Sequence, residues 1–438
     1  MADRMNENSP EWVDVSQLRL GLFIELDLGW MAHPFPSSRF KISSVKQIAA
    51  IRDLGVKRVR FLSAKSDPDA VASTDWLPSP SMGQTSDPLP VQAIDAGFKE
   101  TRQRQLRVMT LEEQKQSLIA CERMFAEAAR QSKRVMDQVL TEPQMAADQC
   151  RALIRGYVDD MSCDGEIAIR LLSQNMGGSA NTHPVNVTVL CLLLGRALGL
   201  SQNEMCDLGV AATLHDMGKL ELPTRVHEFE ADFSPFDLKH YQSHVDLGVL
   251  MAERMALSEA ARIAIAQHHE LEDGSGFPLR AKGGQIGLLS KILVLVNRYE
   301  NLCNHGRPEK AITPHEALAL IFAQLRSQFD EKVLNSFIRM MGIYPPGSII
   351  EFLDGRHALV VSVNSSRPLR PRVIVYDPLT PKSEALILDL EQASEVNIRR
   401  SLKPSSLSSA AWDYFLPRKR ICYFFERSID PTLLREEK

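Results

Sequence analysis

The stretch TLHDMGKLELP, residues 213–223, places a histidine directly before an aspartate inside an apolar segment. Leu214 and Met217 flank the pair, which is typical of a buried helix. A buried carboxylate is costly unless a partner or a metal ion compensates its charge. The nature of the compensation at Asp216 therefore decides what kind of fold and site this chain forms.

Helical patterns extend in both directions from this stretch. Between residues 145 and 343 one apolar helical segment follows another, including NVTVLCLLLGRALG, EAARIAIAQHH and LLSKILVLVNRYENL. This predicts a mainly α chain with an all-helical core. The preceding segment, residues 96–144, predicts a long amphipathic connector helix that could also support a homodimer. Its expected apolar stripe consists of Leu118, Cys121, Phe125, Ala128 and Val135.

The two ends of the chain have different patterns. Residues 12–63 combine strand-like LRLGLFIEL and KRVRFL with the helical SVKQIAAIRDLG, which predicts a small α/β N-terminal domain. Residues 64–95 are rich in Ser, Asp and Pro and indicate a flexible linker. Residues 344–438 contain SIIEFL, HALVVSVN and RVIVYD between turn signals, which predicts a small β-rich C-terminal region.

Composition excludes several classes of protein. The net charge of −4 gives no basic surplus for binding nucleic acid. No apolar run reaches the roughly 18 to 20 residues of a membrane span, and the polar N-terminus MADRMNENSP does not resemble a signal peptide. Seven cysteines without a CxxC pair indicate reduced thiols, so a cytoplasmic protein is expected.

Five histidines of the helical core offer ligands for metal ions: His183, His215, His244, His268 and His269. Imidazole and carboxylate donors suit iron, manganese or zinc. With two oxygens, Asp216 is the natural bridge between two ions, and two ions roughly 3.5–4 Å apart would clamp a phosphodiester from both sides. Lys219 follows on the same expected helical face and could hold a phosphate oxygen beside the metal.

Four segments resemble the HD-GYP branch of the HD phosphohydrolase superfamily. They are HDMGKLELP, SHVDLG, HHELEDGSGFP and KILVLVNRYENL, and the likeness runs from about residue 175 to 345. The N-terminal WVDVSQLRLGLFIELDLGWMAHPFP also resembles the small domain often found ahead of HD-GYP domains in bacteria. Members of this branch are bacterial phosphodiesterases that hydrolyse the second messenger cyclic di-GMP to pGpG or GMP with two or three metal ions.

The resemblance implies a role for each matching position. The first metal ion would be held by His183, His215, Asp216 and Asn297, and the second by Asp216, His244, His268 and His269. Lys219 matches the lysine that contacts phosphate, so Asp216 and Lys219 are the expected catalytic residues. Phe277, Arg307 and Lys310 match further positions that contact the substrate.

Three positions depart from the family pattern. Ser179 stands where three-metal members carry a glutamate, so two ions are expected rather than three. Asn297 replaces an aspartate and brings no negative charge to the first metal ion. Phe277 replaces the tyrosine of the GYP motif and cannot donate its hydrogen bond.

Two functions remain open from the sequence. The first is a metal-dependent phosphodiesterase that hydrolyses cyclic di-GMP, with another phosphoester as a possible substrate. The second is a catalytically weakened module that binds cyclic di-GMP or a partner protein. In that case the resemblance implies that the GSGFP loop docks a diguanylate cyclase.

Overall fold

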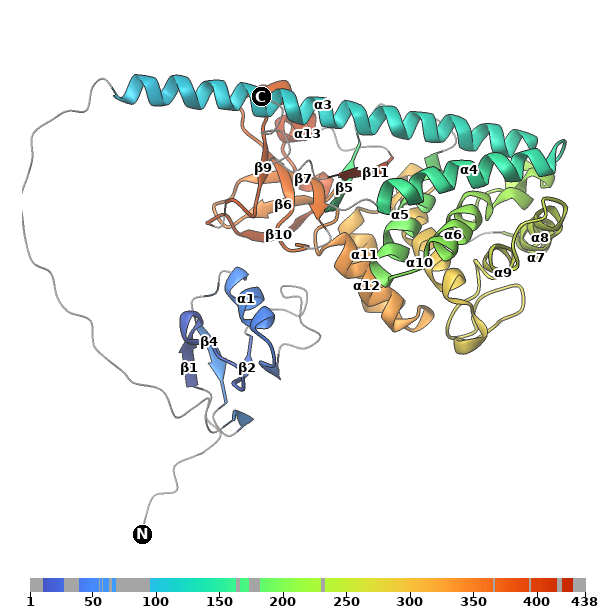
Figure 1. Ribbon diagram of the computed structural model, residues 1–438, viewed down its shortest axis with the longest axis horizontal. Coiled ribbons are helices and arrows are strands. Elements are labelled where there is room, and N and C mark those ends of the chain that lie inside the picture. Colours follow the sequence, from blue (N-terminus) through green and yellow to red (C-terminus); the bar gives the residue numbers. More distant parts are fainter. Residues whose placement is uncertain are drawn as a thin grey trace, which may run out of the picture. The chain divides into compact units, whose positions relative to one another are not determined.

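The computed structural model describes residues 11–26, 39–54, 56, 58–62, 65–67, 95–162, 166–172, 182–229, 233–364, 367–393, 395–415 and 420–427. The chain divides into two compact units, one of residues 1–110 with 391–397 and one of residues 111–390 with 398–438. Helices predominate among the described residues, which confirms the expected mainly α class (Figure 1). No helix found there is long and apolar enough to span a bilayer.

In the N-terminal unit, the described residues between 11 and 61 form a four-stranded antiparallel sheet and helix α1, where the sequence predicted two strand-like segments and one helix. The strand order is β1-β4-β2-β3, with β1 at Glu11–Asp14, β4 at Arg58–Phe61, β2 at Phe23–Glu25 and β3 at Arg39–Lys41. Helix α1 covers Val45–Asp53, and the Ser44 side chain caps its first turn. The apolar side chains of Ile24, Ile42 and Ile51 form the fully buried centre of the N-terminal unit.

Most of the predicted linker lies outside the described residues. After it, helix α3 runs without a break from Asp95 to Gln138. The residues predicted to form its apolar stripe between 121 and 135 are buried. Phe125 packs edge-on against Phe424 at a ring separation of 6.3 Å. The part of the stripe around Cys121 and Phe125 is therefore covered by the chain's own C-terminal strand.

The helical core follows α3 and is built around α5. Its helices are α4 (Pro143–Ser162), α5 (Thr182–Leu198), α6 (Gln202–Leu214), α7 (Pro235–Gln242), α8 (His244–Arg254), α9 (Glu259–Ala266), α10 (Leu288–Cys303), α11 (Pro314–Gln324) and α12 (Glu331–Met341). Short 3-10 helices connect them: η5 (Met217–Glu221), η6 (Thr224–Val226), η7 (Gly283–Gln285), η8 (Pro308–Lys310) and η9 (Arg326–Gln328). Nearly all of α5 is buried because it is apolar on every side and packs against α6, α10 and α12.

The second sheet joins the C-terminal region to the helical core. Its order is β10-β6-β7-β5-β11, and β8 and β9 extend it beyond β7. The strands are β5 (Ile167–Leu171), β6 (Ile349–Phe352), β7 (His357–Asn364), β8 (Arg372–Val375), β9 (Ile387–Asp389), β10 (Ile398–Leu402) and β11 (Tyr423–Arg427), accompanied by helix α13 (Ser409–Phe415). The β-rich C-terminal region is thus confirmed.

Strand β5 corrects the prediction of an uninterrupted helical core. It lies between α4 and α5 and pairs with both β7 and β11. All five of its residues are buried, so its sequence IAIRL lacks the alternation of a half-buried strand. Its partners lie about 190 and 250 residues further along the chain, and a local pattern cannot reveal such pairing.

Candidate metal centre

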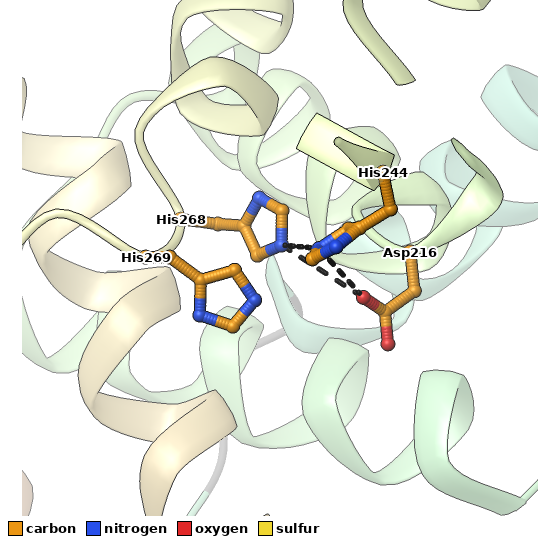
Figure 2. Close-up of side chains that lie close together, drawn as sticks. All are labelled: Asp216, His244, His268 and His269. Atoms are coloured by element: carbon orange, nitrogen blue, oxygen red, sulfur yellow. Dashed lines mark hydrogen bonds and ion pairs between the residues drawn. The ribbon is translucent and has the colours of Figure 1, made fainter. Parts of the chain in front are cut away.

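Four separate parts of the helical core carry the predicted ligands to one place. His183 lies in the first turn of α5, His215 and Asp216 follow the end of α6, His244 begins α8, and His268 and His269 follow α9. Two sets of side chains have ligand atoms within 4.8 Å of one another: Asp216 with His244, His268 and His269, and Asp216 with His183 and His215. Figure 2 shows His244, His268 and Asp216 pointing toward one another, with His269 beside them.

The carboxylate of Asp216 lies between the two sets. Its Oδ2 is 3.4 Å from Nε2 of His215 and 3.8 Å from Nε2 of His183. Its Oδ1 is 3.5 Å from Nε2 of His244 and 3.8 Å from Nε2 of His268. Each oxygen therefore faces one histidine set, which is the arrangement a bridging carboxylate requires.

Backbone carbonyls orient three of the imidazoles in the same way. Nδ1 of His215 lies 2.9 Å from the carbonyl oxygen of Ala212, and Nδ1 of His268 lies 2.6 Å from that of Ile265. His244 makes the same contact with the carbonyl three residues before it, at Tyr241. A carbonyl can only accept, so each Nδ1 carries the proton and each Nε2 presents a lone pair toward Asp216.

The protonation states of the cluster suit metal binding. Burial would raise the pKa of Asp216, but the charge of Lys219 and the contact with His215 hold this pKa well below its usual value. Burial lowers the pKa of His244 to about 3 and also lowers the pKa of His215 and His269. An ionised carboxylate beside these three neutral imidazoles is the state in which such side chains bind metal.

Two buried polar atoms in the cluster have no hydrogen-bond partner. They are Oδ1 of Asp216 and Nε2 of His269. Such orphaned atoms are rare in folded proteins, because each loses its hydration without compensation. A cation placed among the histidines would satisfy both, so the residues present fit a metal ion. This fit supports a divalent metal site, while the number and identity of the ions stay predictions.

The segment around Lys219 differs from the predicted continuous helix. Helix α6 ends at Leu214, and η5 begins at Met217 after a break at His215 and Asp216. The break turns the carboxylate toward the other histidines, whereas a continuous helix would keep adjacent side chains about 100° apart. Lys219 still reaches the carboxylate, with Nζ 2.7 Å from Oδ2 of Asp216.

Gly218 allows η5 to lie directly against α8. A Cβ atom at this position would be 2.0 Å from the carbonyl oxygen of His244 and 2.7 Å from the amide nitrogen of Gly248. Both neighbours are backbone atoms and cannot move without shifting α8. We expect Gly218→Ala to lower the free energy of unfolding in urea by about 3 kcal/mol.

Gly156 provides the matched control for this substitution. It lies in α4, where an added Cβ would meet no atom within 4 Å. Gly156→Ala should therefore raise the free energy of unfolding by up to about 1 kcal/mol, the gain in helix propensity. Unchanged stability of Gly218→Ala would contradict the close packing of η5 against α8.

Phe277 lies at the edge of the histidine cluster. Its ring stacks on that of His269 at a centroid separation of 4.4 Å and an interplanar angle of 19°. The loop that carries it is held by Glu270, whose carboxylate accepts hydrogen bonds from the backbone N–H groups of Leu279 and Ala281 at 2.7 and 2.8 Å. The predicted site residue is therefore beside the ligands, although its role toward a substrate is untested.

The remaining predicted residues lie on α10, around η8 or outside the described structure. Asn297 is buried in α10, and its Oδ1 accepts a hydrogen bond from Asn301 at 2.7 Å. Arg307 and Lys310 are exposed around η8. Ser179 falls in a segment that the structure does not describe. The roles of these residues stay predictions.

Glu300 is a residue of the site that the sequence analysis missed. It is buried one turn after Asn297 in α10, and its Oε2 lies 2.5 Å from Nδ1 of His183. Burial would lower the pKa of His183, but the charge of Glu300 raises this pKa above its usual value. An acidic residue within the apolar segment KILVLVNRYENL was the signal that could have found it.

Comparison with known families identifies the class of this fold and site. Residues 159–333 match the family model described as HD domain, and residues 12–150 match a domain of unknown function, DUF3391. Residues 159–333 are therefore similar to an HD domain, as their motifs predict.

The chain is also similar to individual proteins. The chain is 24% identical to the cyclic di-GMP phosphodiesterase PA4108 of Pseudomonas aeruginosa, over 92% of this chain and 93% of that protein. It is 24% identical to the cyclic di-GMP phosphodiesterase PdeB of Borreliella burgdorferi over 44% of this chain, and it spans only 50% of that protein. The solved structure of Bd1817, an HDG"Y"P protein from Bdellovibrio bacteriovorus, matches with a TM-score of 0.42 and 13% identity, over 75% of this chain and 98% of that one.

Proposed function

We propose that the chain is a metal-dependent phosphodiesterase that hydrolyses cyclic di-GMP to pGpG, to GMP or to both. The observation that carries this proposal is the carboxylate of Asp216, whose two oxygens face separate histidine sets. Such a carboxylate can hold two ions at the spacing that clamps a phosphodiester. The likeness to PA4108, a cyclic di-GMP phosphodiesterase, over 92% of the chain supports the choice of substrate.

The proposed metal ligands form two sets joined by one carboxylate. Beside Asp216, they are His183 and His215 on one side and His244, His268 and His269 on the other. Donors of these types favour iron or manganese, with zinc as a further option. Two divalent ions bound here would supply a nucleophile from water at neutral pH and neutralise charge on the phosphate.

The chain's own side chains orient the substrate and balance its charge. Lys219 is close enough to Asp216 to contact a phosphate oxygen beside the ions, so we assign it to catalysis and substrate binding. Arg307 and Lys310 contribute exposed positive charge that we assign to the substrate phosphates. Phe277 packs over His269, and we assign it to substrate binding at that side of the cluster.

Asn297 decides between this function and a binding module without turnover. Purified chain, loaded with manganese or iron, is expected to hydrolyse cyclic di-GMP, because the Asp216 bridge does not depend on Asn297. Asn297→Asp is expected to raise kcat/KM by about tenfold, since a carboxylate binds a divalent ion more tightly than an amide oxygen does. Chromatography of the products measures the rate of hydrolysis by the parent chain and by Asn297→Asp.

Asn335→Asp serves as the control for added charge, because Asn335 is exposed on α12. It should leave hydrolysis at the parent level. Turnover in Asn297→Asp alone, with none in the parent, would contradict the proposed enzyme and support a module that binds cyclic di-GMP or docks a diguanylate cyclase. A panel with other cyclic dinucleotides and with phosphomonoesters then identifies the preferred substrate.

The setting of this activity also belongs to the proposal. We infer a cytoplasmic protein, because the seven cysteines of the sequence include no CxxC pair and indicate reduced thiols. We further propose the division into residues 12–63, 64–95, 96–144, 145–343 and 344–438, in which α3 connects the N-terminal part to the phosphohydrolase core. A homodimer and docking of a diguanylate cyclase are the expected protein contacts.

A further inference from the structure

Glu300 ties one histidine of the metal centre to the rest of the fold. It is almost fully buried in α10, and its two oxygens have different partners. Oε2 contacts Nδ1 of His183 at 2.5 Å, which leaves Nε2 of that ring facing Asp216. Oε1 accepts hydrogen bonds from the side-chain amides of Asn186 at 3.0 Å and Asn304 at 2.7 Å. The carboxylate is therefore fixed from both sides.

The same two asparagines hold the segment that leads into β11. Both Nδ2 groups also donate to the carbonyl oxygen of Ile421, at 2.9 Å from Asn186 and 2.8 Å from Asn304. In return, Oδ1 of Asn304 accepts from the backbone N–H of Ile421 at 2.7 Å, and Oδ1 of Asn186 accepts from that of Tyr423 at 3.0 Å. Every hydrogen-bonding group of the two amides is thereby used, so their orientation is unique.

This segment is held in turn by parts of the chain outside the helical core. Strand β11 pairs with β5 along all five of its residues. The carboxylate of Glu426 accepts a hydrogen bond from Ser117 of α3 and lies 3.4 Å from the buried guanidinium of Arg170. Residues 421–427 thus contact the long helix on one side and, through the asparagines, Glu300 on the other.

We propose that Glu300 is a positioning residue for His183 and that residues 421–427 complete the metal centre by locking Glu300 in place. The proposal rests on the proposed function, since it concerns the same ligands. It assigns a role at the site to residues that lie beyond the matched HD domain of residues 159–333.

The cost of burial supports this role. A carboxylate enclosed in an apolar helix bundle is expensive unless all its hydrogen bonds are satisfied. Stability alone would be better served by an apolar side chain, whereas orientation of a ligand histidine by a carboxylate is a common device in metal sites. The dedicated pair of asparagines indicates that the orientation of Glu300 matters.

The first test measures metal affinity in the full-length chain by titration with manganese. Glu300→Gln should lower the affinity for one of the two ions by roughly 10- to 100-fold, the usual effect of losing a partner of a ligand histidine. Asn304 contacts none of the proposed metal ligands, yet Asn304→Ala should lower the affinity for the same ion by roughly threefold or more. The other ion, held by His244, His268 and His269, should keep its parent affinity.

A matched control separates this effect from a general loss of stability. Thr188→Val is isosteric and removes a buried hydrogen bond between α5 and α6, where Thr188 Oγ1 lies 3.0 Å from Thr213 Oγ1. It leaves Glu300 untouched, so both ions should bind as in the parent. Equal weakening of both ions in Glu300→Gln, or unchanged affinity in both test variants, would overturn the proposal.

The second test uses the reciprocity of coupled equilibria. If residues 421–427 stabilise the bound metal, saturating manganese must slow amide hydrogen exchange in that segment. The slowing should persist in Thr188→Val and be lost in Asn304→Ala. The proposal would be overturned if bound manganese left the rate of amide hydrogen exchange in residues 421–427 of the parent unchanged. Parent protein that binds two ions without hydrolysing cyclic di-GMP would refute only the proposed phosphodiesterase, because both tests read metal binding rather than turnover.

Discussion

Asp216→Ala is expected to release both metal ions and to lower kcat/KM for cyclic di-GMP by at least about a thousandfold. Removal of one electrostatic stabiliser from an active site commonly costs 10²–10³ in rate. Asp216 offers one oxygen to each histidine set, so its loss removes a ligand from two ions at once. Metal content by mass spectrometry and initial rates on the same sample measure the two effects.

Two further variants test whether the loss of both ions is specific to Asp216. Asp246→Ala removes an exposed carboxylate from α8, near His244 in the sequence, and should retain both ions and full activity. His269→Ala removes a ligand from one set only, so the ion held with His183 and His215 should remain. An Asp216→Ala protein that still carries two ions would show that the carboxylate is no bridge.

Glu270→Ala should strongly lower the stability of the fold without removing a proposed metal ligand. The side chain is fully buried, and each of its oxygens accepts one backbone N–H, from Leu279 and Ala281. Hydrogen bonds to charged groups contribute about 1.5–3 kcal/mol each, so we expect a loss of roughly 3 kcal/mol in the free energy of unfolding in urea. The freed loop should also release Phe277 from His269 and raise KM.

Asp273→Ala is the matched control in the same loop. Asp273 is exposed, and its Oδ1 accepts hydrogen bonds from the backbone and the side chain of Ser275. Its loss should lower the free energy of unfolding by no more than about 1 kcal/mol and leave KM unchanged. Equal effects of the two substitutions would contradict the special role of the buried carboxylate of Glu270.

The helices of the core were predictable because their information is local. Segments such as α5 and α10 combine length, apolar residues and the absence of Pro beyond the first turn, where α5 carries Pro184. These features suffice without knowledge of tertiary contacts. Strand β5 was missed because it is short, uniformly buried and defined only by partners far along the chain. The break after Leu214 was missed for a similar reason, since packing of Gly218 against α8 stabilises the turn.

The candidate site was also predictable in part, where its information is local. Histidine and aspartate side chains could be selected by chemistry, because few residues bind transition metals and Asp216 lies in an apolar segment. Their convergence follows from the packing of four helical segments, which no spacing encodes. Glu300 escaped because its partner His183 lies 117 residues earlier in the chain, and its importance becomes visible only when that contact is measured.

A crystal structure of the manganese-loaded chain, with anomalous scattering at the manganese edge, tests the central claim most directly. The account predicts two anomalous peaks roughly 3.5–4 Å apart, one on each side of the Asp216 carboxylate. One peak should lie next to His183 and His215 and the other next to His244, His268 and His269. An absence of peaks, or a single peak that the Asp216 carboxylate does not contact, would contradict it.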